Sequence, residues 1–380
     1  GPATMLLDVR RVAAGEWRLY GPEGLRAQRQ YWTLRGDATD CAGLSDEDLL
    51  DQLQQRLDHG VRIALRSDVP VGLFLSGGID SSIVAQSAAR LGRLDTAFCV
   101  DFAEQAFSEW PRASEVARQL DIPLTRVGLG VGVLGEFLDV ASHLDDPLAD
   151  SSAMAIWTVA RAAASRVKVV LSGDGGDELF GGYLTYPASA WHARLRHWLP
   201  AGAWRAAAAA SARLPMNDRV KVGIDYKLHR FLRAMPLPTN EAHFTWNGTW
   251  LPDSAATLVR GDAARAAAGN ALHRLVASHG LESTPSLASL QLADTRDYLP
   301  NDILSKVDRA TMAHGLESRA PLLNTAVAEL AIAPLLAGEC EEEEGEDNPP
   351  CVEFDEHPVV LELPLDRPVL HRDTKPAPAT

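Results

Sequence analysis

The sequence predicts an α/β fold, an open parallel sheet with helices on both faces, followed by a mostly helical C-terminal part. Between residue 45 and about residue 171, short β-rich runs alternate with amphipathic helical segments, which is typical of a parallel sheet covered by helices. Glycine-rich loops follow two of the β-rich runs, directly before helical segments. From residue 189 to about residue 336 the pattern is almost wholly helical.

A capping-box sequence at Ser45 begins the first predicted helix, which runs to about Arg66 with leucine or valine at every fourth position. Four runs rich in apolar and β-branched residues then predict parallel strands. Amphipathic segments between and after them predict helices. The predicted strands are 71–75, 96–102, 124–127 and 167–171, and the predicted helices are 81–91, 108–120, 133–142 and 152–165.

Composition changes divide the chain into three parts. Residues 1–44 contain short strand-like runs at 10–12, 17–20 and 31–34 and are predicted to be a lead-in segment. Residues 45–336 form the predicted main domain. Residues 337–380 begin with a run of glutamates and continue with many prolines, a composition that predicts a disordered tail.

Charge and cysteine usage narrow the class of protein. A net charge of −15 argues against nucleic acid and anionic membranes as partners, because phosphate binding requires clustered Lys and Arg. The four cysteines form no close-spaced pairs, which indicates a reducing compartment. No signal peptide or membrane span is predicted. We therefore expect a cytoplasmic protein that acts on small molecules.

The loop after the first predicted strand, residues 76–82, reads Ser-Gly-Gly-Ile-Asp-Ser-Ser. Glycines let backbone N–H groups approach a phosphate, and the helix N-terminus adds unpaired N–H groups and a partial charge of about +0.5. The loop lacks the Gly-Lys-Ser ending of a Walker loop. Asp80 would repel a polyphosphate unless a cation lay between them, which predicts Mg²⁺. In the alternative interpretation Asp80 caps a helix after a tight turn.

A second glycine-rich loop, residues 172–182, follows the last predicted strand and holds three acids among five positions. Asp174, Asp177 and Glu178 would repel one another without a metal or a cationic substrate. An acid-rich helix start explains Glu178 but not the density of glycines. Because both loops follow parallel strands, we expect them to converge on one crevice.

A third segment, residues 298–323, combines charges with helical spacing. Asp302 and Lys306 stand four residues apart and predict an ordinary helical ion pair. Later charges form either a salt-bridge network or part of a substrate site, and they are Asp308, Arg309, Glu317 and Arg319. In the acidic run 145–152, Asp150 either caps the next helix or shapes a substrate pocket.

Residues 66–82 resemble the pyrophosphate-loop (PP-loop) ATP enzymes, whose fold is of the adenine nucleotide alpha hydrolase type. The second loop is similar, almost residue for residue, to the signature of the asparagine synthetase branch, and residues 145–152 and 298–323 resemble its other motifs. The resemblance covers about residues 1–334. It implies that Asp80 and Asp177 bind Mg²⁺ and that Asp174, Arg309 and Glu317 are catalytic. The nucleotide-binding residues it implies are Leu75, Ser76, Gly77, Gly78, Asp80, Ser81, Ser82, Val100, Ser172 and Gly173.

The resemblance implies a ligase that forms carbon–nitrogen bonds with ATP and Mg²⁺. Aspartate would be adenylated on its side-chain carboxylate, and ammonia would then displace AMP to give asparagine. Two alternatives remain open: a natural-product amide ligase or cyclase of the lasso-peptide or β-lactam type, and a nucleotide-binding pseudo-enzyme. Thiolation and nucleotide-amination enzymes are disfavoured, because paired cysteines and a basic surface are missing.

Two parts of the family pattern are missing. The lead-in resembles the strand pair that follows a glutaminase domain, and the sequence does not contain that domain. Ammonia is therefore expected from a separate glutaminase domain or subunit, and a homodimer is a further expectation. Family members also carry a late lysine that stabilises the charged intermediate, but beyond Arg319 this chain has only Lys375. Either another lysine substitutes, or the C-terminus is truncated or frame-disrupted.

Overall fold

The computed structural model describes part of the chain, and all described residues belong to one compact unit. The chain divides into two units, Gly1–Glu339 and Cys340–Thr380. The predicted acidic tail lies outside the described residues. The described residues are 4, 6, 8–34, 44–92, 94–104, 106–144, 146, 148, 150–213, 223–248 and 252–333.

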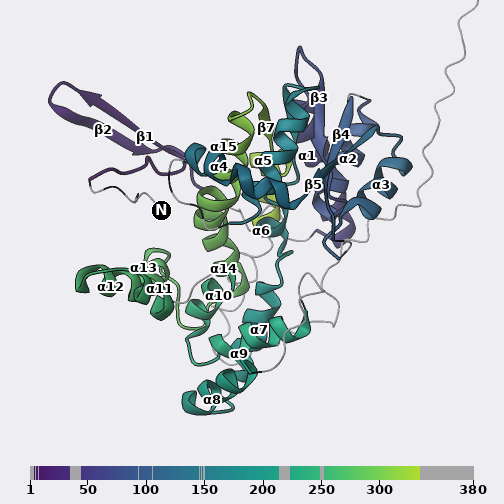
Figure 1. Ribbon diagram of the computed structural model, residues 1–380. Helices are drawn as coiled ribbons and strands as arrows, with labels where there is room; N and C mark the ends of the chain where they lie inside the picture. Colours follow the sequence, from purple (N-terminus) through teal and green to yellow (C-terminus); the bar gives the residue numbers. More distant parts are fainter. Residues whose placement is uncertain are drawn as a thin grey trace, which may run out of the picture. The chain divides into compact units, whose positions relative to one another are not determined.

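Five parallel strands form the central sheet, and Figure 1 labels β3, β4, β5 and β7 among them. The strand order is β5-β4-β3-β6-β7. The four predicted strands are confirmed. The sequence does not predict β7, because Glu-Ser-Arg is a short polar run whose strand conformation depends on pairing with β6. The strands are β3 (Val71–Phe74), β4 (Thr96–Phe102), β5 (Leu124–Leu129), β6 (Val169–Leu171) and β7 (Glu317–Arg319).

Helices cover both faces of this sheet, as predicted. Because successive strand residues point to opposite faces, neighbours on β3 belong to different cores. Leu73 is fully buried in a cluster with α1 (Asp46–Ala64), α2 (Ile79–Arg90) and α3 (Trp110–Gln119). Phe74 packs on the other side, against a cluster that includes α5 (Ala153–Ala164).

The helix predictions before residue 170 are confirmed with one change of type. At the start of α1 the Ser45 hydroxyl accepts a hydrogen bond from the Asp48 N–H at 3.2 Å, and the Asp48 carboxylate accepts one from the Ser45 N–H. The segment predicted as a helix at 133–142 begins instead as a 3₁₀ helix, η2 (Val131–Glu136), and continues as α4 (Phe137–His143).

The chain beyond β6 is mostly helical, as predicted, apart from β7. A π-helix, η3, precedes α15, and π-helical turns often occur at functional sites. No helix in the described ranges is both long and apolar enough to cross a membrane. These elements are α6 (Gly176–Phe180), α7 (Thr185–Leu195), α8 (Ala201–Ser211), α9 (Ile224–Ala234), α10 (Thr239–Asn247), α11 (Pro252–Leu258), α12 (Asp262–Gly269), α13 (Ala271–Ser278), α14 (Leu287–Ala293), η3 (Asp294–Ile303), α15 (Leu304–Met312) and η4 (Pro321–Leu323).

The N-terminal segment forms an antiparallel hairpin of β1 (Glu16–Gly21) and β2 (Gly24–Gln30). The strand-like run at 17–20 is confirmed as part of β1. The runs at 10–12 and 31–34 lie outside both strands, so those two strand predictions are wrong. The sequence does not predict β2, because five of its seven residues are neither β-branched nor apolar and six are exposed.

Candidate functional site

The carboxyl ends of β3 and β6 mark the point where the order of the sheet reverses. The chain leaves β3 toward β4 on one side, and after β6 the next strand to join the sheet is β7 on the other side. β3 and β6 are direct neighbours, with Leu73 opposite Leu171. Ligands bind at such switch points in open α/β sheets. Both predicted glycine-rich loops emerge here.

The first loop is held together by its own serines. The Ser76 hydroxyl accepts a hydrogen bond from the Gly78 N–H at 3.2 Å and lies 3.0 Å from the Ser81 hydroxyl. The Ser82 hydroxyl donates to the Gly78 carbonyl at 2.7 Å. No side chain caps the start of α2. Its first N–H groups, with these hydroxyls, form a preorganised site for an anion.

Gly77 is required by its backbone and by its neighbours. Its φ is +72°, a conformation that favours glycine. A Cβ there would also lie 2.6 Å from the carbonyl carbon of Arg112, at the start of α3. The loop is therefore fixed against α3 in a shape that no larger residue permits without strain.

The second loop packs directly onto the first through two glycines. A Cβ on Gly173 would lie 2.7 Å from the backbone nitrogen of Ser81. A Cβ on Gly176 would overlap the Asp80 carboxyl group. The predicted convergence of the two loops is confirmed, and the glycines explain how the chains come so close.

Where the loops meet, the charges of two carboxyl groups, Asp174 and Asp177, act on a third, Asp80. Burial, together with the charges of Asp177 and Asp174, raises the pKa of Asp80 to about 6. Burial also raises the pKa values of Asp177 and Asp174. Carboxylates crowded in this way are stabilised by a cation placed between them.

Asp80 and Asp177, the two predicted metal ligands, fit a magnesium ion that also binds a phosphate. Within the described ranges neither carboxylate accepts a hydrogen bond or pairs with a lysine or arginine. The same part of the chain contains no group of three or more His, Cys, Asp and Glu side chains that could hold a metal. Mg²⁺ commonly takes one or two carboxylates and completes its shell with phosphate oxygens and water.

Ser172, a predicted nucleotide-binding residue, offers a buried hydroxyl beside these acids. Its side chain is 4% exposed, and its oxygen has no hydrogen bond of standard geometry in the described structure. It lies near enough to Asp174 to lower that residue's pKa against the larger effect of burial. A buried polar atom without a partner usually indicates a ligand or a water.

Lys306 is a site feature that the sequence reasoning missed. Its ammonium donates to the Asp150 carboxylate and to the Ser152 hydroxyl, the latter at 2.8 Å. The predicted Asp302–Lys306 ion pair is wrong, since Asp302 belongs to η3, where the π-helical winding breaks the α-helical spacing. One Asp302 oxygen is instead buried without a hydrogen-bond partner.

Asp150 does not occupy the N-cap position of α5, which belongs to Ser152. Its carboxylate accepts a hydrogen bond from the Ser152 N–H at 2.8 Å and pairs with Lys306. Of the two interpretations of Asp150, the structure therefore excludes the cap position itself and ties the residue to Lys306. The available signal for Lys306 was its place among apolar residues in the third motif.

The structure does not bring Glu317 to the acid cluster. Glu317 pairs with Val169 at the amino end of β6, whereas the second loop leaves the carboxyl end. Its side chain is 59% exposed and accepts a hydrogen bond from Arg319 at 2.7 Å. Arg309 lies on α15, one turn beyond Lys306. The catalytic roles of Arg309 and Glu317 stay predictions.

Leu75 and Val100, two of the predicted nucleotide-binding residues, both pack among apolar side chains around the sheet. Leu75 is 1% exposed, and its N–H donates to the Phe98 carbonyl at 2.9 Å. Val100 lies on β4 and packs against the apolar cluster that includes α5. Their contact with a nucleotide stays a prediction.

A buried polar network lies behind the second loop. Asp294 is fully buried, and its Oδ2 accepts hydrogen bonds from the Tyr186 hydroxyl at 2.9 Å and from the His243 Nε2 at 3.0 Å. The His243 Nδ1 lies 3.0 Å from the Ser189 hydroxyl. Closer to the site, the Tyr183 hydroxyl donates to Glu178 at 2.8 Å.

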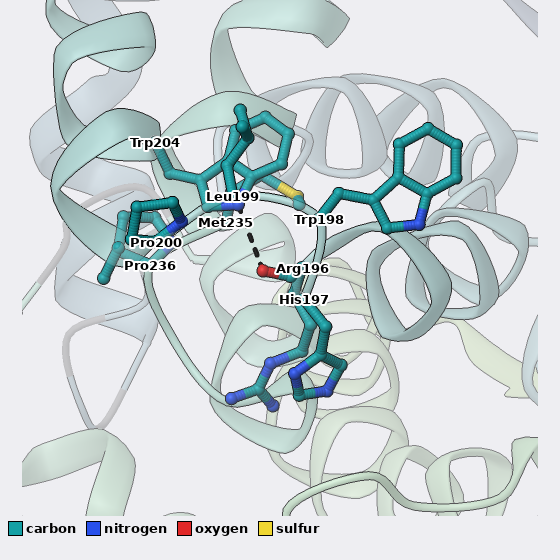
Figure 2. A pocket seen from close by; sticks show the side chains of 9 residues that line it. Arg196, His197, Trp198, Leu199, Pro200, Trp204, Met235 and Pro236 are labelled. Atoms are coloured by element: carbon teal, nitrogen blue, oxygen red, sulfur yellow. Dashed lines mark hydrogen bonds between the residues drawn. The ribbon is translucent and has the colours of Figure 1, made fainter.

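A cavity of about 330 Å³ lies elsewhere, in the helical part (Figure 2). It is lined by residues 196–201 between α7 and α8, by Trp204, and by Met235 and Pro236 after α9. The Trp204 indole N–H donates to the Arg196 carbonyl at 3.1 Å, the bond drawn in Figure 2. None of the residues predicted to carry chemistry lines this cavity.

The site and fold define an α/β protein with a loop cluster suited to phosphate and a divalent cation. Residues 52–335 match the asparagine synthase family, and the chain belongs to that family.

Curated relatives show the same similarity. Asparagine synthetase [glutamine-hydrolyzing] 1 of Bacillus subtilis is 30% identical over 336 residues, which cover 87% of this chain and 50% of that protein. A putative asparagine synthetase [glutamine-hydrolyzing] of Mycobacterium tuberculosis is 31% identical over 346 residues, with 87% and 49% covered. Amidase chyE of Penicillium rubens is 33% identical over 203 residues, with 49% and 30% covered. The chain thus spans about half the length of the asparagine synthetases it matches.

Proposed function

We propose that this chain is the synthetase part of an asparagine synthetase-type amide ligase. It would activate the side-chain carboxylate of aspartate with ATP and transfer the acyl group to ammonia. The observation that carries the proposal is the contact of the two loops, in which Gly173 and Gly176 pack on Ser81 and Asp80. That contact supports an anion site and an uncompensated acidic pair at the switch point of the sheet.

The first chemical step is adenylation. Ser76, Ser81, Ser82 and the N–H groups at the start of α2 would bind the pyrophosphate part of ATP. A carboxylate oxygen of aspartate attacks the α-phosphorus, the bond to pyrophosphate breaks, and an acyl-adenylate forms. Mg²⁺, held by Asp80 and Asp177, would neutralise phosphate charge when bound. The protein contributes mainly position and charge complementarity.

The second step is amide formation. The lone pair of ammonia attacks the acyl carbon, the carbon–oxygen bond to AMP breaks, and the nitrogen loses one proton. Asp174 is the proposed acceptor of that proton, because burial raises its pKa and makes it a stronger base, while the charge of Lys306 acts in the opposite direction and favours its ionised form. Arg309 and Glu317 are proposed to shape the aspartate site indirectly.

The proposed partners follow from the family. Ammonia would come from a glutaminase domain or subunit, and the half-length match to glutamine-hydrolyzing relatives supports that part of the proposal. We also propose that the protein is cytoplasmic and forms a homodimer. Widely spaced cysteines in the sequence support a reducing compartment.

A second candidate function is amide formation on a different acid, in natural-product synthesis. A relative named an amidase, 33% identical over 203 residues, supports only that family members act on amides other than asparagine. Both candidates use the same two loops. They differ in the acyl pocket.

The test is ATP–pyrophosphate exchange with a panel of carboxylic acids. Labelled pyrophosphate is incubated with the chain, Mg²⁺, ATP and aspartate, glutamate or a larger acid. We expect exchange that depends on aspartate. Exchange with another acid alone would favour the second candidate. Tight Mg-ATP binding without exchange for any acid would contradict both and indicate a nucleotide-binding pseudo-enzyme.

A further inference from the structure

Lys306 is unusual among the positive charges of the described chain. It is 6% exposed, and no other lysine or arginine in the described ranges is buried. Burying an ammonium is costly unless it is paired and hydrogen-bonded. Pairing with Asp150 offsets part of that cost, and such a buried ion pair motivates a search for its use.

Packing of α15 against α5 fixes the position of Lys306. Ala310 on α15 shares an apolar cluster with Ala153 and Trp157 on α5. Asp150 and Ser152, directly before α5, are the two residues that accept hydrogen bonds from the Lys306 ammonium. Asp150 is itself fixed by the Ser152 N–H at 2.8 Å. The ammonium thus has one defined position.

One N–H of Lys306 remains for a ligand. An ammonium has three donors, and Asp150 and Ser152 accept two hydrogen bonds from it. No third acceptor contacts it among the described residues. The buried Asp302 oxygen and the buried Ser172 hydroxyl also lack partners in the described ranges. Three polar groups near one another thus keep hydrogen-bonding capacity that a substrate can use.

The charge of Lys306 reaches the loop cluster. It lowers the pKa of Asp174 in the second loop and that of Asp302 in η3, against the larger, raising effect of burial. The charge of Asp174 in turn raises the pKa of Asp80 in the first loop. Lys306 lies in the first turn of α15, directly after η3, and η3 lies beside the second loop, since the Tyr298 ring centroid is 5.9 Å from that of Tyr183. Asp80 and Asp177 form the acidic side that fits a metal.

We propose that Lys306 is a catalytic residue of the amide-forming step, and that Asp150 and Ser152 are its positioning residues. This inference rests on the proposed function. As ammonia forms its bond to the acyl carbon, the carbonyl π electrons move to oxygen, and the free N–H of Lys306 donates to that oxygen. The electron pair returns as the bond to AMP breaks, AMP leaves with its bridging oxygen, and the proton from nitrogen passes to Asp174.

This assignment gives Lys306 no part in the attack on ATP. A group that stabilises only the second transition state lowers the rate of amide formation when it is removed and leaves adenylation intact. The two half-reactions can be measured separately, which makes the assignment testable.

The experiment compares Lys306→Met with the matched control Lys168→Met, since Lys168 is an exposed lysine after α5. ATP–pyrophosphate exchange reports adenylation, and ammonia-dependent amide formation reports the second step. Removing one donor to a developing oxyanion typically costs 10²–10³-fold in rate. We expect Lys306→Met to lose amide formation by about 10²-fold or more and to keep exchange within about fivefold. Lys168→Met should change neither rate.

A folding control keeps the test decisive. Lys306→Met leaves the Asp150 carboxylate without its partner, so the double variant with Asp150→Asn removes both charges. In whichever variant folds, by circular dichroism, a loss confined to amide formation supports the proposal. Equal losses in both half-reactions, or no loss in either, overturn it. Absence of exchange in the unmodified chain with every acid would instead contradict the proposed function.

Discussion

A buried acid and a pair of half-buried acids within the same unit differ in how their charge is neutralised. Asp294, fully buried in the helical part, accepts hydrogen bonds from Tyr186 and His243. Asp80 and Asp177, at the strand ends, have no hydrogen-bond donor or cation of the described chain beside them. The first arrangement gives one oxygen of a buried carboxylate two protein donors, while its Oδ1 has no partner in the described structure. The second leaves charge for a ligand to neutralise.

The comparison also shows that side chains arranged like a known catalytic triad need not form an active site. Ser189, His243 and Asp294 are linked in the order of a hydrolase triad, with 3.0 Å at each step. Yet His243 and Asp294 are fully buried and Ser189 is 3% exposed, so no substrate reaches them. The better-satisfied network is structural, and the poorly satisfied acids mark the site.

The largest expected effect comes from Asp80→Asn. Loss of the proposed metal ligand should reduce ATP–pyrophosphate exchange by about 10³-fold or more. The same change should raise the stability of the ligand-free protein at pH 7.5, by at most about 3 kcal/mol, because it removes a carboxylate whose pKa is raised to about 6. Urea unfolding measures the stability. Asp51→Asn, on the exposed side of α1, is the control and should change neither quantity.

The opposite signs are the decisive part of that prediction. A loss of activity together with a loss of stability would indicate that Asp80 is a structural residue.

The next largest effect is expected from Gly176→Ala. The new methyl group would overlap the Asp80 carboxyl group and displace that side chain from its position in the site. We expect binding of Mg-ATP to weaken by about 10²-fold, equivalent to about 3 kcal/mol, measured by calorimetry. Gly202→Ala, where a Cβ meets no atom within 4 Å, is the matched control. Unchanged binding in Gly176→Ala would show that the loops do not form the nucleotide site.

Removing a partner from the satisfied network should act on stability alone. Tyr186→Phe deletes the hydroxyl that donates to Asp294 and should lower the free energy of unfolding by about 1–2 kcal/mol. ATP–pyrophosphate exchange per folded molecule should stay unchanged. A selective loss of exchange would mean that the network belongs to the site.

The smallest effect is a pH dependence. Asp80 has a folded pKa of about 6 and Glu178 a folded pKa of about 7, both raised from ordinary values of 3.8 and 4.5, chiefly by burial. Between about pH 4 and pH 7 the folded state therefore binds more protons than the unfolded state, and these groups make stability fall as pH rises. The variant Asp80→Asn with Glu178→Gln should show a weaker fall in urea-unfolding free energy from pH 5 to pH 7.5. An equal fall would contradict the assignment.

The sequence predicts the fold well where local patterns and tertiary packing agree. Apolar runs on β3 and β6 and the capping box at Ser45 each specify their element locally. β7 could not be predicted, because its three polar residues become a strand only beside β6. The π-helical winding of η3 is likewise hidden, which is why the Asp302–Lys306 pair was predicted wrongly.

Within the site, the sequence predicts the two loops but not the contacts between residues that lie far apart in the sequence. Asp80 and Asp174 follow strands, and the rule for parallel sheets brings strand ends together. Lys306 and Asp150 are 156 positions apart, and only the packing of α15 on α5 makes them neighbours. The sequence motif likewise gives no indication that the Glu317 side chain is exposed.

Binding of Mn²⁺ in the presence of a non-hydrolysable ATP analogue tests the central claim most directly. Electron paramagnetic resonance counts the bound ions in the unmodified chain and in the variant with Asp80→Asn and Asp177→Asn. The account predicts one tightly bound Mn²⁺ for each unmodified chain and none at the same concentration for the variant. Equal Mn²⁺ binding by the two proteins would contradict it.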